Sequence, residues 1–256
     1  MGIPKKSRKI TKSLSVCKHE EKRVCTLVHQ STRTIGSLPK DLLIDVLARV
    51  ASSSLTGLFS AKLSCKEFLE STKDDYIFQH ISLDKFPVTE WSPLSQREYS
   101  FLSHCFIKGN PESLFRQGMI EYFKQVNVNF GLEFLKRAVE KGHSEATYVY
   151  GMILLSGGDQ SSQHGLNLLN SMNCSRSRNW NVRECRDKID TILSRMWINN
   201  RIALEKVNTK CQKRDHVIRF EKRGWSLDED IEISSCHTCL WYRELVYFCR
   251  IMNVIV

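Results

Sequence analysis

The sequence predicts an all-α protein, in which a three-helix unit is followed by a short α-hairpin repeat array and an irregular cysteine-containing C-terminus. Two observations predict this fold class. Apolar residues between positions 38 and 70 recur at intervals of three and four, the period of an amphipathic helix. Glycine-marked stretches farther along recur after 33 and 34 residues, as in arrays of helical hairpins. We therefore expect four parts, residues 1–36, 37–86, 95–206 and 207–256.

Residues 1–36 are predicted to be a disordered basic tail. They hold nine Lys/Arg against two Asp/Glu and no aromatic residue, so folding would bury too little surface to offset the entropy of ordering. The cluster from Lys5 to Lys9 fits either a nuclear localisation signal or a solvated tail. No run of about eighteen apolar residues occurs, and no secretory signal opens the chain, so we expect a soluble protein of the nucleus or cytoplasm.

The three-helix unit follows from Pro39 onwards. Pro39 suits the first turn of a helix, where its missing N–H is not needed. The serines from Ser52 to Ser54 break this helix and offer N-caps to a second one that begins near Leu55. Further short, closely joined helices are indicated by apolar side chains at helical spacing, namely Leu58, Phe59, Leu63, Cys65, Phe68 and Leu69.

The repeat array is predicted from two copies of one pattern. Gly118-Met119-Ile120 recurs as Gly151-Met152-Ile153, and the stretch that opens at Gly131 recurs at Gly165. Helix ends are marked by Asn110-Pro111-Glu112, by Lys141-Gly142 and by Ser144, which we expect to cap the next helix. Two hairpins are few for a stable array, so a helix around Phe101 and another after Trp180 should cover its two ends.

The stretch from Leu38 to Phe68 resembles an F-box. The resemblance rests on the opening pair Leu38-Pro39, on the paired aliphatic residues of the helix after it, and on Cys65-Lys66-Glu67-Phe68. It covers residues 38–86 without a gap. Phe68 stands where the family often has Trp, Ser64 where an aliphatic residue is usual, and Ala51 where a second proline is common.

This resemblance implies a unit that binds the Skp-type adaptor of a ubiquitin ligase, and through it the cullin and RING subunits. The physical reading agrees, because a unit this short cannot bury all its apolar side chains, and exposed apolar patches mark protein interfaces. The alternative is that these side chains only form the core of a small helical domain. The residues predicted to form the adaptor-facing surface are Leu38, Pro39, Leu42, Leu55, Leu58 and Leu63.

The hairpins resemble Sel-like repeats, which are relatives of the tetratricopeptide hairpin. Matching places are held by Gly118, Gly131, Ala138, Gly142, Ala146, Tyr148, Gly151 and Gly165. F-box segments occur with such repeats and a cysteine-bearing C-terminus in plant proteins, and the chain is similar to that group. The resemblance implies a substrate-recognition adaptor of an Skp–cullin–F-box (SCF) ligase, whose repeats present a protein client on their concave face.

The C-terminal cysteines are weak candidates for a metal site. Cys236 and Cys239 have a spacing that lets two thiolates reach one Zn²⁺. Two more ligands would have to come from Cys211, His216 or Cys249, whose spacings are irregular. We therefore expect buried structural thiols, no firm metal site and no cofactor.

Two other function classes are less well supported. Residues 174–225 hold fourteen Lys/Arg against six Asp/Glu, which would suit a nucleic-acid-associated or other helical-repeat scaffold, but no recognised nucleic-acid module accompanies them. The sequence also lacks a phosphate-binding glycine loop, a Gly-x-Ser-x-Gly elbow and a His-Glu-x-x-His motif. We expect no enzymatic activity, with the ligase chemistry supplied by partner subunits.

Overall fold

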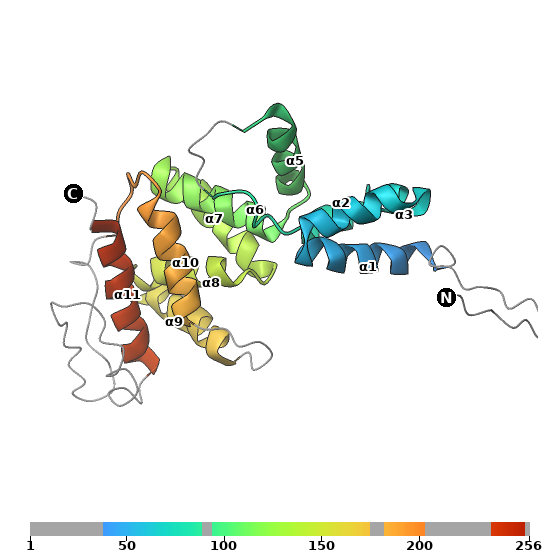
Figure 1. Ribbon diagram of the computed structural model, residues 1–256. Helices are drawn as coiled ribbons and strands as arrows, with labels where there is room; N and C mark the ends of the chain where they lie inside the picture. The colour runs from blue at the N-terminus through green and yellow to red at the C-terminus, as the bar shows by residue number, and fades with distance from the viewer. Residues whose placement is uncertain (1–37, 89–93, 175–181, 203–236, 254–256) are drawn as a thin grey trace, which may run out of the picture. The chain divides into compact units, whose positions relative to one another are not determined.

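The computed structural model describes residues 38–88, 94–174, 182–202 and 237–253 (Figure 1). Every regular element within these ranges is a helix, which confirms the all-α prediction. The expected basic tail with its Lys5 to Lys9 cluster lies outside the described residues. Among the described helices, none has both the length and the apolar character that a membrane span requires.

The N-terminal unit contains one helix more than the sequence predicts. Ser54 accepts a hydrogen bond from the Gly57 N–H (3.0 Å) and caps a helix that begins at Leu55, as expected. The additional helix begins after Asp74, whose carboxylate accepts from the Tyr76 N–H (2.9 Å). It is only six residues long, too short to show a helical period. The helices are α1 (Lys40–Ser53), α2 (Leu55–Ser64), α3 (Lys66–Ser71) and α4 (Asp75–His80).

The apolar core of this unit draws on one face of α1 and one of α2. Its buried members are Leu43, Ile44, Leu47, Ala48, Ala51, Leu55, Leu58, Ile77, Ile81, Leu83 and Cys105. Cys105 belongs to α5 (Gln96–Ile107), the helix expected to cover one end of the repeats. Phe101 and Leu102 of the same helix also pack on this core, whereas Phe106 packs on the core of the repeats. Helix α5 therefore contacts both cores.

Two helical hairpins form the repeat array, as predicted. The first pairs α6 (Pro111–Met119), which continues as the π-helix η2 (Ile120–Lys124), with α7 (Val128–Glu140). The second pairs α8 (Ser144–Leu155) with α9 (Asp159–Cys174). Both copies use glycine in the same way: a Cβ at Gly118 would lie 2.8 Å from Leu135 Cγ, and a Cβ at Gly151 would lie 2.6 Å from Leu169 Cγ. The repeated glycines thus let paired helices approach closely.

The helix ends of the array follow the prediction at two places and differ at a third. Asn110 caps α6 by accepting from the Ser113 N–H (3.1 Å), with Pro111 in the first turn. Gly142 ends the first hairpin with φ +79°, a left-handed conformation that glycine adopts without strain. The predicted cap Ser144 is wrong, because the imidazole Nδ1 of His143 accepts the Ala146 N–H (3.1 Å) and so caps α8.

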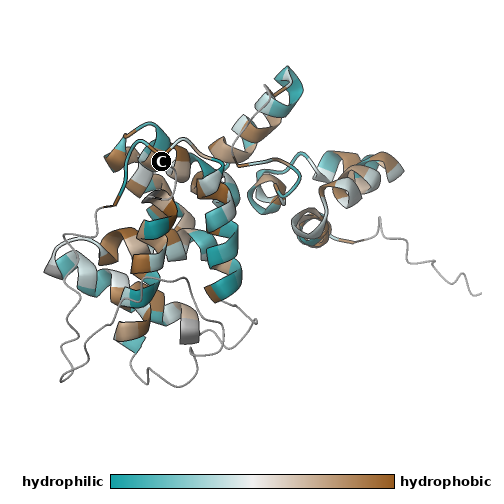
Figure 2. Cartoon of the chain, turned by 60° about the vertical axis from the view of Figure 1, so that its left-hand side comes forward, coloured by the Kyte–Doolittle hydropathy of each residue, from teal (hydrophilic) through white to brown (hydrophobic). Residues whose placement is uncertain are grey.

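The far end of the array is covered by α10 (Val182–Ser194) and by α11 (His237–Asn253). The second of these helices lies in the segment that was expected to be irregular, of which residues 207–236 are outside the described ranges. Helix α11 has a fully buried stripe at helical spacing, formed by Trp241, Leu245, Phe248 and Met252. Figure 2 shows brown and teal alternating along many of the helices, as this amphipathic packing requires.

Candidate functional site

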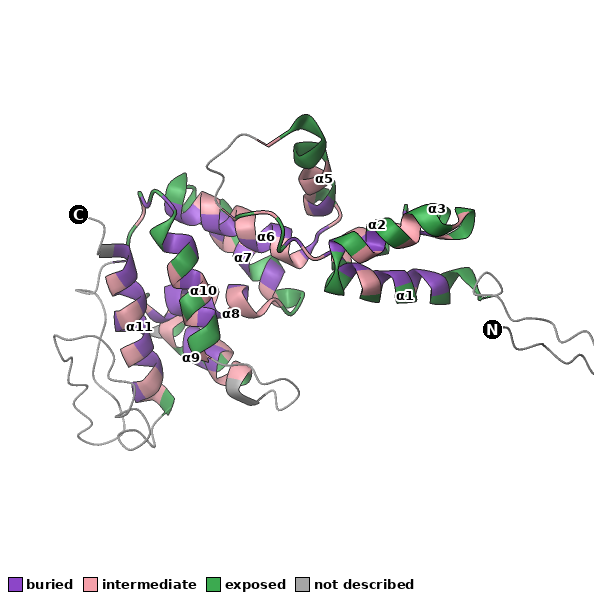
Figure 3. Ribbon diagram, viewed as in Figure 1, coloured by how far each residue is buried: buried purple, intermediate pink, exposed green. Residues whose placement is uncertain are grey.

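The candidate site begins on the solvent-facing side of α1. Leu38, Leu42 and Val46 follow one another at intervals of four and keep 39%, 54% and 42% of their surface exposed. Leu43 and Leu47 point the other way and are buried in the core of the unit. The helix is therefore apolar on two sides, and the residues that the structure describes cover one of them; Figure 3 shows buried and exposed positions alternating along α1.

Helices α2 and α3 add a second group of exposed apolar side chains. Phe59 and Leu63, four residues apart on α2, are 47% and 87% exposed, and Leu69 on α3 is 38% exposed. Because the side chain of Leu63 is almost fully exposed, it adds little to the stability of the isolated unit. Together with the exposed apolar side chains around it, Leu63 is the clearest sign of an interface in this unit.

The structure divides the six residues predicted for the adaptor-facing surface. Leu38, Pro39, Leu42 and Leu63 are exposed, whereas Leu55 and Leu58 are buried, with 7% and 5% of their surface accessible. The last two form part of the core because α2 turns them towards α1. Conversely, Val46, Phe59 and Leu69 are exposed although they are not among the six residues predicted for this surface. We define the candidate docking face as Leu38, Pro39, Leu42, Val46, Phe59, Leu63 and Leu69.

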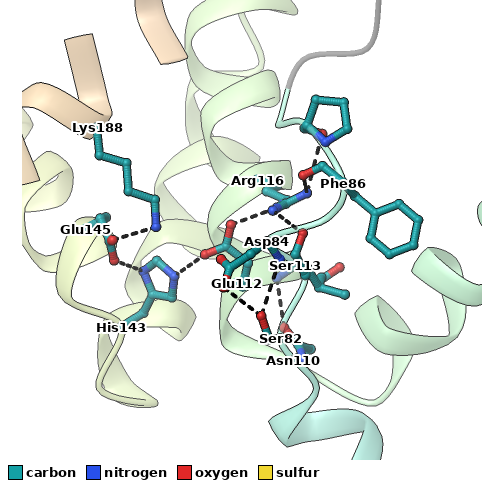
Figure 4. A network of polar contacts seen from close by, with 12 residues as sticks. Ser82, Asp84, Phe86, Asn110, Glu112, Ser113, Arg116, His143, Glu145 and Lys188 are labelled. Atoms are coloured by element: carbon teal, nitrogen blue, oxygen red, sulfur yellow. Dashed lines mark hydrogen bonds and ion pairs between the residues drawn. The ribbon is translucent and has the colours of Figure 1, made fainter. Parts of the chain in front are cut away.

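A buried polar network joins this unit to the first repeat (Figure 4). The guanidinium of Arg116 on α6 donates to the carbonyl oxygens of Leu83 (2.9 Å) and Phe86 (2.7 Å), which lie in the segment after α4. Its Nε also pairs with Glu112 at 2.8 Å. Arginine suits this position because its planar fork can donate in several directions while it holds a carboxylate.

The same network continues into the second repeat through His143. Its Nε2 lies 2.7 Å from Glu112 Oε2, and its Nδ1 accepts the Ala146 N–H. The proton of the neutral ring must therefore be on Nε2, which donates it to Glu112. Glu145, whose Oε2 lies 3.6 Å from His143 Nδ1 without a hydrogen bond, pairs with Lys188 on α10 at 2.6 Å. One chain of contacts thus runs from the end of the N-terminal unit to α10.

The charge of Glu112 is maintained by these partners. Burial on its own would raise the pKa of the carboxyl, but the hydrogen bond from His143 and the positive charge of Arg116 outweigh it and hold the pKa at about 2. The carboxylate is therefore ionised at neutral pH, and it links the two hairpins and the preceding segment as an anion.

Asn110 makes a second buried connection at the same junction. Its Nδ2 donates to the carbonyl oxygens of Phe78 and Ile81, both at 2.9 Å, while its Oδ1 caps α6. Only 1% of the residue is exposed. One side chain therefore provides hydrogen-bond partners both for carbonyl groups at the carboxyl end of α4 and for an N–H group at the amino end of α6.

The cysteines that the structure describes form no candidate metal site. Within the described ranges, no three His, Cys, Asp or Glu side chains gather in a way that could hold a metal ion. Cys239 is buried on α11, and Cys236 lies outside the described residues. Burial raises the pKa of Cys105 and of Cys249 to about 12, so these thiols stay protonated at neutral pH.

Comparison with known proteins places the fold in a class. A family model described as plant tetratrico peptide repeats matches residues 83–194, which span α5 to α10. No solved structure matches the chain. The hairpins that follow the N-terminal helices therefore define an all-α protein with a tetratricopeptide-like repeat region.

Curated relatives give the family. At1g67623 of Arabidopsis thaliana is 33% identical over 78% of this chain and 71% of its own length. At2g35280 is 27% identical over 57% of this chain and 87% of its own length, and At1g67340 is 24% identical over 60% and 44%. All three carry the F-box name and come from the same plant. The chain belongs to this family of plant F-box proteins.

Proposed function

We propose that the chain is a substrate-recognition adaptor of an SCF ubiquitin ligase, which docks on a Skp-type subunit through the candidate docking face. The observation that carries the proposal is the set of apolar side chains that the unit leaves exposed on α1, α2 and α3, above all Leu63 and Leu42. Covering a leucine side chain completely is worth about 1.5–3 kcal/mol. Two such residues can therefore dominate the affinity of an interface.

The junction at Arg116 and Asn110 supports the second half of the proposal, that the repeats hold a client for the ligase. A ligase adaptor acts by proximity, because it raises the effective concentration of the client near the transferring subunit. Buried hydrogen bonds that join the docking unit to the repeats would keep this geometry fixed. The chain itself needs no catalytic group or cofactor in this role, and the complex would act in the nucleus or cytoplasm.

Binding measurements with the purified chain and a Skp-type subunit test this proposal. The double variant Leu42→Ala, Leu63→Ala should bind at least about a hundredfold more weakly, because each truncation removes a contact worth roughly 1.4 kcal/mol or more. Its thermal unfolding should stay the same, since neither side chain supports the core. A matched control is the pair Tyr99→Ala, Ile107→Ala on α5, which is as exposed (61% and 72%) but lies outside the candidate docking face.

The proposal fails if the wild-type chain does not bind the Skp-type subunit, or if the α1 and α2 variant binds as tightly as the control variant. The alternative function, a nucleic-acid-associated scaffold, rests on the basic residues 174–225. Most of them lie outside the described ranges, and no contact in the structure favours that function.

A further inference from the structure

A second exposed apolar surface lies on the first repeat, away from the candidate docking face. Along one side of α7 lie Phe130, Phe134 and Arg137, and the C-cap residue Lys141 continues the spacing of four, three and four. Phe130 is 65% exposed. The buried residues of α7, which include Leu135, lie on another side and form part of the repeat core. Helix α7 therefore presents a stripe that changes from aromatic to basic along its length.

The end of α5 widens this stripe. The rings of Phe106 and Phe134 meet edge to face, with their centroids 5.3 Å apart. The next residue, Ile107, is 72% exposed. Farther along, the side chain of Lys141 lies beside Gly109, because a Cβ placed on that glycine would be 3.3 Å from Lys141 Cε. Helix α5 itself is mostly exposed or half-buried in Figure 3. We call this surface the α5–α7 face, formed by Phe106, Ile107, Phe130, Phe134, Arg137 and Lys141.

The six residues of this face carry two positive charges, Arg137 and Lys141, and no negative one. Arg137 lies over the ring of Phe134, 5.9 Å from its centroid. Neither Arg137 nor Lys141 pairs with a carboxylate of the residues that the structure describes, whereas the neighbouring Lys108 pairs with Asp75 at 2.8 Å. The other charged groups of α7, which are Glu133, Lys136 and Glu140, lie close enough to Tyr150 of α8 to act on its hydroxyl. Glu133 lies one turn before Arg137 and Glu140 directly precedes Lys141, but neither carboxylate forms an ion pair with these two cations in the structure.

We infer that the α5–α7 face binds an acidic amphipathic helix of the client protein, an inference that rests on the proposed function. Phe130 and Lys141 are separated by eleven residues, about 16 Å along the axis at 1.5 Å per residue, which equals three turns of a bound helix. Apolar anchors at intervals of three and four would cover Phe130, Phe134 and Ile107. Carboxylates one or two turns farther on would meet Arg137 and Lys141.

The pattern of charge also argues against a second copy of this chain as the occupant. A two-fold dimer would place identical faces together, so each Arg137 and Lys141 would meet an aromatic end or another basic end. No carboxylate of the α5–α7 face is available to pair with them. Burying these cations without partners would be unfavourable, whereas an acidic helix supplies the missing charge.

The probe for this inference is a labelled 16-residue amphipathic helical peptide that carries three leucines and then three glutamates on one face. The purified chain should bind it, and a peptide with glutamine in place of glutamate should bind about tenfold more weakly. The variant Ile107→Ala, Phe130→Ala should lose at least about tenfold in affinity for both peptides. The variant Arg137→Gln, Lys141→Gln should weaken binding of the glutamate peptide only, to the level of the glutamine peptide.

Several results would overturn the inference. They are absence of binding by both peptides, equal binding of glutamate and glutamine peptides, and affinities that do not change in either variant. Sedimentation that shows a dimer abolished by Phe130→Ala would assign the face to a second copy instead. The variant Leu42→Ala, Leu63→Ala separates this inference from the proposed function, because it should lose the Skp-type subunit and keep the peptide.

Discussion

At the scale of single residues, Glu112 offers a test of what holds the junction together. Its pKa is about 2 in the folded chain, below its usual value of 4.5, so the unfolded chain takes up a proton between these values and the folded chain does not. The stability that Glu112 contributes is therefore complete above about pH 5 and is lost as the pH falls towards 2. We expect Glu112→Gln to lower the free energy of unfolding at pH 7 by at most about 3 kcal/mol, and hardly at all near pH 2.

Urea unfolding of both proteins between pH 7 and pH 2.5 measures this difference directly. Glu98→Gln is a suitable control, because hydrogen bonds from Ser95 lower the pKa of Glu98 too, but water screens the exposed carboxylate of this capping box. Its effect should be small and nearly independent of pH. If the difference in the free energy of unfolding between wild type and Glu112→Gln stays constant from pH 7 to pH 2.5, the carboxylate does not stabilise the junction as an anion.

At the scale of elements, the paired glycines of the hairpins predict a graded set of stabilities. A Cβ at Gly165 would lie 2.7 Å from the backbone nitrogen of Leu155 and 2.8 Å from the carbonyl oxygen of Gly151, and backbone atoms cannot yield without moving a helix. At Gly151 the obstacle is the Leu169 side chain, which has some freedom. We therefore expect Gly165→Ala to lower the free energy of unfolding by about 2–3 kcal/mol, and Gly151→Ala to lower it by about 1–2 kcal/mol.

The control for this series is Gly158→Ala in the turn between α8 and α9, where a Cβ would meet nothing within 4 Å. It should leave the melting temperature unchanged or raise it slightly, because alanine restricts the unfolded chain. Equal losses at Gly165 and Gly158 would mean that close helix approach is not what the repeated glycine provides.

The elements also show how far sequence reasoning reaches. Local signals were sufficient for the Ser54 and Asn110 caps, for the hairpin repeat and for the left-handed Gly142. The cap of α8 was missed because His143 depends on Glu112, a partner 31 residues away. The resemblance to an F-box predicts Leu55 and Leu58 on the adaptor-facing surface, whereas the packing of α2 on α1 buries both of them.

The candidate sites divide in the same way. The motif that begins at Leu38-Pro39 was sufficient to locate the candidate docking face, although its membership needed the structure. The α5–α7 face could not be derived from the sequence, since it depends on Phe106 meeting Phe134 across 28 residues of chain. In the sequence, an exposed phenylalanine and a buried one show the same helical spacing. Only the position of the neighbouring helix decides which of them is covered.

At the scale of the whole molecule, two separate apolar cores raise the question of whether the chain unfolds as one body. Asn110 joins them, since its amide donates to the carbonyl oxygens of Phe78 and Ile81 while its oxygen caps α6. Asn110→Asp keeps the cap and removes both donors, and it places a negative charge beside two buried carbonyls. We expect a loss of about 2–4 kcal/mol, because those carbonyls lose their partners in a buried site.

In the Asn110→Asp variant the two cores should unfold at different temperatures, instead of unfolding together at one lowered melting temperature. Scanning calorimetry of Asn110→Asp should resolve a first transition for the core that contains Leu47 and Ile77, followed by a second for the repeats. Asn167→Asp makes the same chemical change on the exposed side of α9, where the amide oxygen accepts from Gln163, and should keep a single transition. If the buried variant also melts in one step at the wild-type temperature, then the hydrogen bonds at Asn110 do not join the cores. Their coupling would then depend on the bonds from Arg116 to Leu83 and Phe86, or on α5, whose Cys105 and Phe106 pack on different cores.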